Sequence, residues 1–201
     1  MYVPSHFQLD DAGALAAVAA RSAGTIVVAH EGGFEASLVP WVLDGHRLLG
    51  HVARPNPLAR LLSAPTACLV LFDVADGYVS PSWYPSKAEH GQVVPTWNYE
   101  AVHLHGTARV VDEPAWIRAQ VEALTRRHEA GRATPWSVRD APDDYVAKLA
   151  RGIVGIEVTI ERIEGKAKLS QNKSDADRAG VEAGLTEVTP RPSVLDLMRA
   201  T

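Results

Sequence analysis

Apolar and polar residues alternate over several short segments in the first half of the chain, and this alternation predicts β-strands. The segments 25–30, 35–43 and 46–52 are separated by Glu31-Gly32-Gly33 and Asp44-Gly45. Both separators favour hairpin turns because glycine accepts positive φ. Further strands are predicted at 66–72, 77–82, 97–111 and 153–163. Connections this short favour an antiparallel meander over β-α-β crossovers.

Helical periodicity is clearest over 114–129, where Ile117, Val121 and Leu124 fall on one stripe. Other helices are predicted at 10–21, 57–63, 142–151, 175–183 and 192–199. Residues 81–95 contain three prolines and a glycine, which predicts a loop. The pattern therefore predicts a mainly β (α+β) fold, a β-barrel of about six antiparallel strands with peripheral helices. We expect a single domain over residues 1–201 that ends in a helical tail from about residue 174.

Composition and charge narrow the function classes. The 201-residue chain carries a formal net charge of −4 and no long Lys/Arg run, so its overall field does not favour nucleic acid or an anionic membrane. Its single cysteine, Cys68, excludes an intrachain disulfide and a multi-cysteine zinc site, and its apolar surroundings predict a small buried side chain. No signal peptide or spanning segment is visible, so we expect a cytoplasmic protein without membrane association.

The segment VPTWNYEAVHLHG, residues 94–106, concentrates polar and aromatic chemistry. His103 and His105 fall on one face of a strand, but a metal site would need a third ligand, for which only His51 or His90 is at hand. No G-x-S-x-G context surrounds any serine. We therefore expect no metal, and the sequence specifies no catalytic residue.

An anion site is suggested by the segment Arg54-Pro-Asn56-Pro57. Asn56 is a good N-cap and Pro57 suits the first helical position, so a guanidinium would stand beside a helix start whose free N–H groups attract negative charge. Lys87, in the proline-rich segment, offers a second cation.

Three stretches together resemble a known family. They are the opening MYVPSHF, the central SPSWYPSK with VPTWNYEAVHLHG, and KLSQNKS followed by Asp177, Arg178, Gly180 and Val181. They are similar to the FMN-binding negative transcriptional regulators, the PaiB-like family, from residue 1 to about residue 186. The resemblance implies an FMN-binding split β-barrel, related to the pyridoxamine-phosphate-oxidase and flavin-reductase group, in which homodimers bind FMN in clefts between subunits.

The resemblance and the residue chemistry together give a set of candidate cofactor-binding residues: Arg54, Asn56, Ser82, Trp83, Lys87, Thr96, Trp97, Asn98, Gln171 and Asn172. Arg54 and Lys87 would face the phosphate, whereas Trp97 and Asn98 would face the flavin ring. Packing of Trp97 inside the barrel core is the alternative.

The resemblance implies a homodimeric FMN-binding regulator. No helix-turn-helix with a basic recognition helix is visible, so DNA or another regulatory partner is not evident from the sequence. Two alternatives stay open. One is an FMN-dependent oxidoreductase acting on flavin or a small molecule, and the other is a haem-binding split-barrel protein.

Overall fold

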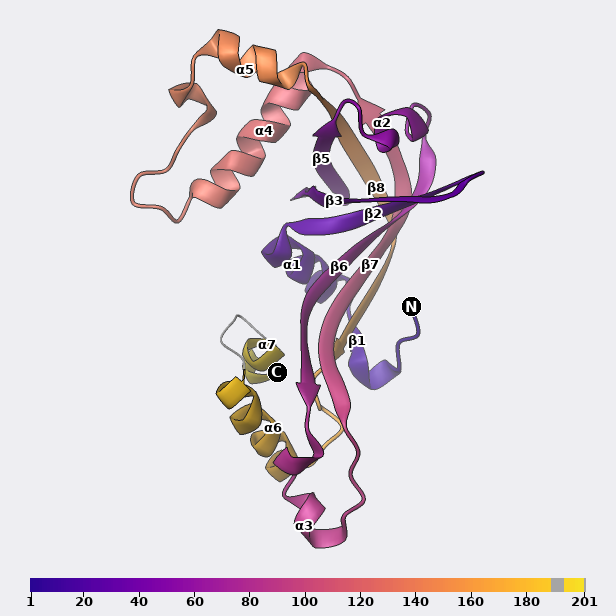
Figure 1. Cartoon of the computed structure of the whole chain (residues 1–201), viewed down its shortest axis with the longest axis vertical. Coiled ribbons are helices and arrows are strands. Elements are labelled where there is room, and N and C mark those ends of the chain that lie inside the picture. Colours follow the sequence, from indigo (N-terminus) through magenta and orange to yellow (C-terminus); the bar gives the residue numbers. More distant parts are fainter. Residues whose placement is uncertain (189–193, 201) are drawn as a thin grey trace. The chain divides into compact units, whose positions relative to one another are not determined.

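The computed structural model describes residues 1–188 and 194–200, and within them the chain forms one antiparallel sheet with helices around it (Figure 1). The described residues contain eight strands: β1 (Gln8–Leu9), β2 (Ala23–His30), β3 (Gly33–Pro40), β4 (Val42–Asp44), β5 (Arg47–Ala53), β6 (Thr66–Val79), β7 (Thr96–Val111) and β8 (Ile153–Lys168). The strand order is β3-β2-β6-β7-β8-β5-β4, and β1 pairs with β8. The sheet does not close into a barrel.

The helices lie between these strands and after them. They are α1 (Asp11–Arg21), α2 (Pro57–Leu61), α3 (Ser86–His90), α4 (Pro114–Glu129), α5 (Asp143–Ala150), α6 (Asp175–Val188) and α7 (Val194–Ala200), with 3-10 turns η1 (Ser5–Phe7), η2 (Pro81–Trp83) and η3 (Val138–Asp140). The predicted helix over 114–129 is confirmed residue for residue. The helix predicted at 192–199 is seen from Val194, and its first two residues lie outside the described part of the chain.

The chain forms two compact units, and each is discontinuous in sequence. Unit 1 comprises Met1–Ala17, Asp73–Val102 and Glu164–Thr201, and unit 2 comprises Val18–Phe72 and His103–Ile163. The long strands β6, β7 and β8 contribute residues to both units.

The mainly antiparallel fold class is confirmed, but two details of the sequence prediction are wrong. The segments 66–72 and 77–82 are not two strands, because β6 runs without a turn from Thr66 to Val79. The buried positions of β6 change from even to odd numbers after Phe72. In the sequence this change looks like a break between two strands, although both parts belong to one strand. The count of about six strands also misses β1 and β4, which have two and three residues and are too short to show a period.

The segment 81–95 is also more ordered than a loop. It contains η2 and α3, and a carboxylate from α6 accepts hydrogen bonds from the first residue of α3. Asp177 accepts hydrogen bonds from the backbone N–H of Ser86 at 3.1 Å and from its hydroxyl at 2.8 Å. These two hydrogen bonds hold the pKa of the buried Asp177 carboxyl below its ordinary value. The polar pair therefore joins residues 91 positions apart.

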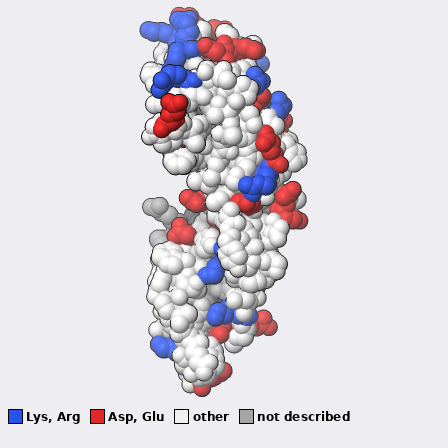
Figure 2. Space-filling view, turned by 90° about the vertical axis from the view of Figure 1, so that its right-hand side faces the viewer, with Lys and Arg blue, Asp and Glu red and all other residues white. Residues whose placement is uncertain are grey.

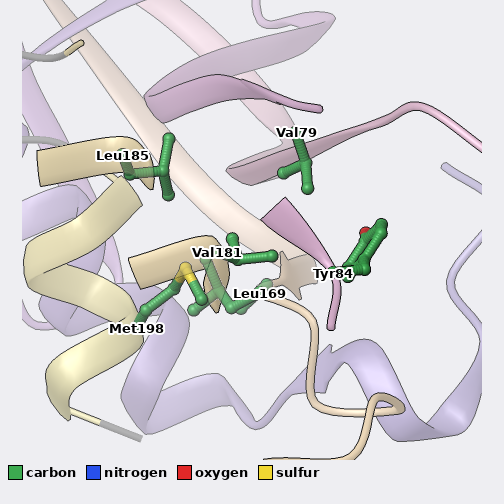
Figure 3. Close-up of a cluster of buried hydrophobic side chains, with 7 residues drawn as sticks. Val79, Tyr84, Leu169, Val181, Leu185 and Met198 are labelled. Atoms are coloured by element: carbon green, nitrogen blue, oxygen red, sulfur yellow. The ribbon is translucent and has the colours of Figure 1, made fainter. Parts of the chain in front are cut away.

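Unit 1 has its own apolar core, shown in Figure 3. Val79 and Tyr84 meet Leu169, Val181, Leu185 and Met198 there. Trp83 packs beside this cluster against two glycines of α6, Gly180 and Gly184. A Cβ at Gly184 would lie 2.2 Å from the Trp83 ring, and one at Gly180 would lie 1.9 Å from the Trp83 carbonyl oxygen. Because both positions are glycine, the backbone and ring of Trp83 pack directly against α6. We call Gly180 and Gly184 the glycine seat for Trp83.

Candidate functional site

Strand β7 divides the residues of the aromatic segment between its two faces. Asn98 and Glu100 are buried, whereas Trp97 is 53% exposed and Tyr99 is half-buried. This division follows from the two-residue period of a strand. The structure thus rules out the alternative in which Trp97 fills the core of this chain.

An aromatic–lysine face, which we define as Tyr78, Trp97, Tyr99, Lys166 and Lys168, lies on β6, β7 and β8 of unit 1. The rings of Tyr78 and Trp97 meet edge to face with their centroids 5.8 Å apart. The ammonium of Lys166 lies 5.1 Å from the centroid of the Tyr99 ring. Lys168 donates to Thr96 Oγ1 and to the Trp97 carbonyl, the latter at 2.7 Å.

Among the residues that the structure describes, the lysines of this face have no acidic partner. Lys166 is only 8% exposed, and its ammonium donates to the Tyr2 carbonyl at 3.1 Å. Within the described residues no carboxylate forms an ion pair with Lys166, Lys168 or Lys173. Burial lowers the pKa of Lys168, and the neighbouring Lys166 and Lys173 lower it further. An anion bound beside Lys168 would offset the repulsion from the neighbouring ammonium groups and would therefore be stabilised there.

Some of the predicted site residues lie on this face or near it. Thr96 and Trp97 belong to the start of β7, and Trp97 is part of the face itself. Lys87 and Ser82 are both exposed, and the Lys87 ammonium donates to the Ser82 hydroxyl at 3.1 Å. Trp83 instead packs against α6, as described above. Their roles toward a cofactor stay predictions.

The predicted carboxamides have structural partners, apart from Asn172, which is exposed. Asn98 is buried and exchanges hydrogen bonds with the Ser170 hydroxyl, at 2.9 Å from its Nδ2. Gln171 accepts from the backbone N–H of Leu169 and donates to the carbonyl of Ala167. The amides of Asn98 and Gln171 therefore hold the segment after β8 in place, and their assignment to a flavin edge stays a prediction.

Arg54 and Asn56 belong to unit 2, where the structure gives both of them partners. The Arg54 guanidinium donates twice to Asp112, at 2.7 Å each, and to the carbonyls of Arg151 and Ile153. The hydrogen bonds with Asp112 raise the pKa of Arg54 and lower that of Asp112. Asn56 caps α2 as predicted, accepting from Leu58 N at 2.9 Å. A phosphate at Arg54 would have to compete with Asp112.

Sequence reasoning missed Tyr78, Lys166 and Lys168. The last strand was predicted to end at Ile163, whereas β8 continues to Lys168. The signal was present in Lys166-Ala167-Lys168, an alternation that places two lysines on one face and an alanine in the core. Two lysines so close together look like a solvent-exposed segment after the end of the strand, so the sequence pattern does not reveal that the strand continues.

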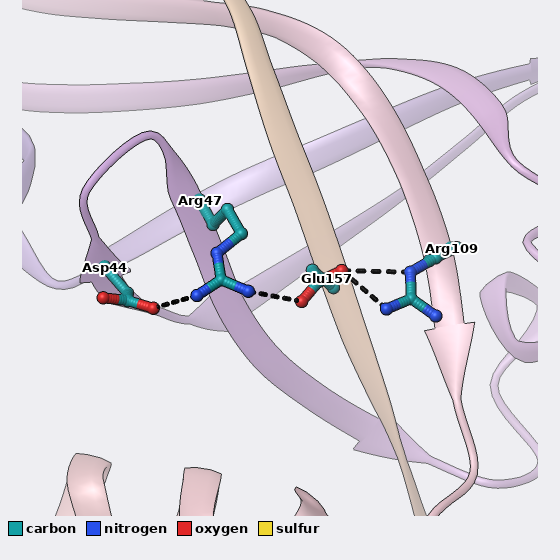
Figure 4. A network of polar contacts seen from close by, with 4 residues as sticks. All are labelled: Asp44, Arg47, Arg109 and Glu157. Carbon is teal, nitrogen blue, oxygen red and sulfur yellow. Dashed lines mark hydrogen bonds and ion pairs between the residues drawn. The ribbon is translucent and has the colours of Figure 1, made fainter.

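In unit 2, acidic and basic side chains form ion pairs with one another, as Figure 4 shows. Glu157 of β8 accepts from Arg109 at 2.8 and 3.0 Å and from Arg47 at 3.3 Å, and Arg47 also contacts Asp44. The Glu157 side chain is nearly buried, whereas both arginines are half exposed. This network neutralises its own charge and leaves little attraction for an anion.

Other classes of site find little support in the described part of the chain. His103 and His105 are half-buried on β7, and no group of three His, Cys, Asp or Glu side chains comes together around a metal position among the described residues. Acidic and basic side chains are interspersed over the face shown in Figure 2, without one extended patch of a single sign. Among the described helices, none is long and apolar enough to cross a bilayer.

Comparisons with known proteins identify the family. Residues 1–162 match the family model described as "Putative FMN-binding domain". The chain is 30% identical over 186 residues to the Bacillus subtilis "Protease synthase and sporulation protein PAI 2", covering 90% of this chain and 87% of that protein. An uncharacterised protein of Emericella nidulans is 36% identical over 186 residues, covering 75% of this chain and 74% of that one. The chain therefore belongs to the FMN-binding-domain family, in agreement with its motifs.

Solved structures support the fold assignment. The FAD and haem binding protein from Mycobacterium smegmatis superposes with a TM-score of 0.58 at 19% identity, covering 81% of this chain and 74% of that one. The flavocytochrome Anf3 from Azotobacter vinelandii superposes with a TM-score of 0.59 at 14% identity, covering 85% and 73%. The fold is that of the split-barrel flavoproteins.

Proposed function

We propose that this protein binds FMN at the aromatic–lysine face of unit 1 and acts as a homodimeric regulator. The observation that carries the proposal is the buried cation Lys166, which has no carboxylate partner among the described residues and lies over the half-buried ring of Tyr99. A buried charge is costly unless a counter-charge accompanies it, and the phosphate of FMN supplies one.

The residues on this face suit both parts of FMN. Trp97 and Tyr78 offer exposed ring surface for a planar apolar ring system, and Lys166 and Lys168 offer ammonium groups for a phosphate. Bound flavin would supply the reversible uptake of one or two electrons. The residues themselves bind, orient and exclude water, and Lys168, with its lowered pKa, can exchange a proton at Nζ more readily than an ordinary lysine.

A second copy of the chain is the partner that we propose for the uncovered surfaces. Phe34 and Leu38 of strand β3, at one end of the strand order, are largely exposed, and Trp97 and Tyr78 in unit 1 are half exposed. Exposed large apolar side chains on a sheet favour association. Family membership supports the same arrangement, because the motif resemblance implies clefts between two subunits.

The flavin assignment is tested by titrating flavin-free protein with FMN, riboflavin and FAD, followed by flavin fluorescence. We expect FMN to bind at least tenfold more tightly than riboflavin, because a charge-assisted hydrogen bond to phosphate contributes about 1.5–3 kcal/mol. Equal affinities for FMN and riboflavin would show that the phosphate does not contribute to binding. Absence of binding by all three flavins would refute it.

The dimer and the regulatory role need separate measurements. Sedimentation at low micromolar concentration should give about twice the 21.7 kDa chain mass, and a monomer that still holds FMN would contradict the dimer. A promoter fragment shifted by yellow protein that NAD(P)H leaves oxidised supports the regulator. Rapid bleaching by NAD(P)H without a shift would identify an oxidoreductase instead.

A further inference from the structure

A groove of about 750 Å³ lies in unit 2, between α4 and α5. Its volume falls within the range of small-molecule sites, roughly 300–1,000 Å³. Apolar side chains form most of its walls, among them Ile117 and Val121 from α4 and Val146 and Leu149 from α5. The groove belongs entirely to unit 2 and is therefore separate from the proposed flavin face.

Several apolar residues of the groove remain in contact with solvent. No residue of α5 is buried, and Tyr145 and Leu149 are 54% and 56% exposed. Trp136, which also lines the groove, is similarly exposed. When an apolar ligand replaces water on such a concave apolar surface, binding is favoured by roughly 25 cal/mol for each Å² of apolar surface that is buried.

His51, on β5, supplies a polar anchor in this apolar wall. The Gln120 side chain donates through Nε2 to the Leu49 carbonyl, so its Oε1 is the atom that accepts, and it lies 2.8 Å from His51 Nδ1. In the neutral tautomer that fits this contact, the imidazole carries its proton on Nδ1 and keeps a lone pair on Nε2. No hydrogen bond to His51 Nε2 is formed within the described residues.

The charges around the groove are largely balanced. Arg54 is paired with Asp112, and Arg118 is paired with Glu122 and with Asp143 at 3.1 Å each. Arg151, also at the wall, is exposed to water. An apolar groove whose ion pairs largely neutralise one another and whose lining includes the His51 imidazole suits a neutral molecule better than an ion.

We propose that this groove binds an uncharged, mainly apolar aromatic molecule whose single hydroxyl or N–H group donates a hydrogen bond to His51 Nε2. Such a molecule would be a second ligand of the protein, distinct from the flavin. In a regulator, it is the class of compound that would act as an effector.

Calorimetric titration of the FMN-saturated protein with three matched probes tests this inference. The probes are 2-naphthol, 2-methoxynaphthalene, which lacks the donor, and the anion 2-naphthoate. We expect 2-naphthol to bind roughly threefold to tenfold more tightly than 2-methoxynaphthalene, the effect of one neutral hydrogen bond. In His51→Phe that preference should disappear, while 2-methoxynaphthalene binding remains.

A second variant, with a substitution at an exposed position, tests the proposal even if the His51→Phe variant does not fold. Leu149→Lys alters an exposed side chain, so it should fold normally and weaken the two neutral probes, 2-naphthol and 2-methoxynaphthalene, roughly tenfold. Val188→Lys, at a similarly exposed helical position in unit 1, should weaken none.

Four results would overturn the proposal: equal affinity for 2-naphthol and its ether, tightest binding by 2-naphthoate, an equal effect of Val188→Lys, or release of FMN by 2-naphthol.

Discussion

The two units of this protein place cations on the same β-sheet but satisfy them in opposite ways. In unit 2, Arg47 and Arg109 share the carboxylate of Glu157, and Arg54 is held by both oxygens of Asp112. In unit 1, the partners of Lys166 and Lys168 among the described residues are carbonyl and hydroxyl oxygens and aromatic rings. These three arginines of unit 2 have carboxylate partners, whereas Lys166 and Lys168 of unit 1 have none among the described residues.

This difference teaches how a binding cation can be told from a structural one. A guanidinium with two carboxylate bonds has already exchanged its hydration for protein contacts, and a ligand gains little by displacing them. A nearly buried ammonium whose hydrogen-bond acceptors are all neutral still has no counter-charge, so an anion that binds beside it stabilises it. The partners of a cation, rather than its position near a helix start, therefore indicate where an anion binds.

The largest effect on stability is expected in unit 2. The double variant Arg47→Met/Arg109→Met leaves the Glu157 carboxylate buried without its donors, so the free energy of unfolding should fall by about 1–3 kcal/mol. Urea unfolding of the flavin-free protein measures this loss. Adding Glu157→Met should recover most of it, because an apolar triad needs no counter-charge. An unchanged double variant would mean that water already solvates Glu157.

In unit 1, Lys166→Met should affect binding and spare stability. FMN affinity should fall by roughly tenfold or more while riboflavin affinity changes little, because the substitution removes a charge and keeps the length of the side chain. The free energy of unfolding of the flavin-free protein should stay constant or rise, since a buried uncompensated cation is lost. A destabilised variant with unaltered FMN affinity would assign Lys166 a purely structural role.

The pH dependence of FMN binding sharpens the comparison further. Lys168 loses its proton at a lower pH than an ordinary lysine, so its attraction for phosphate is present below its lowered pKa and is lost as the pH rises through it. FMN affinity should therefore decline at alkaline pH before ordinary lysines titrate. In Lys168→Arg, which stays charged, this decline should be reduced in fluorescence titrations. A decline of the same size in both proteins would assign the titration to another group.

The smallest effect is expected for Arg54. Because Asp112 and two carbonyls already occupy its guanidinium, Arg54→Met should leave the ratio of FMN to riboflavin affinity within about twofold of the parent value. Parallel titrations of the two flavins measure this ratio. A selective loss of FMN would return the phosphate to unit 2, where the sequence motif predicts it.

The elements that sequence predicted well are those whose pattern is local. The α4 stripe of Ile117 and Val121 and the Asn56 cap depend on neighbours within a few residues, so their periods and side-chain types suffice. The continuity of β6 through Asp76-Gly77 could not be predicted, because the change of phase after Phe72 imitates a turn. There the local preference of the dipeptide is overruled by pairing with strands from distant parts of the chain.

The candidate site was predictable in kind but not in its members. Trp97 was found because an aromatic residue beside a proline-rich segment is conspicuous, and the structure shows it exposed on unit 1. Arg54 was chosen for its helix start, but its partner Asp112 lies 58 residues away and leaves no local signal. Lys166 and Lys168 become informative only when the absence of a nearby carboxylate is known, which is a property of the folded chain.

The glycine seat for Trp83 has a consequence for the order in which the protein is made. Gly180 and Gly184 belong to α6, and the indole that they receive was synthesised about a hundred residues earlier. All of unit 2 has been synthesised once Ile163 has been added, whereas unit 1 still lacks Lys166, Lys168 and α6 at that moment. Because nascent chains fold progressively as they emerge, Trp83 can pack against Gly180 and Gly184 only after α6 has emerged, which is later than the emergence of all of unit 2.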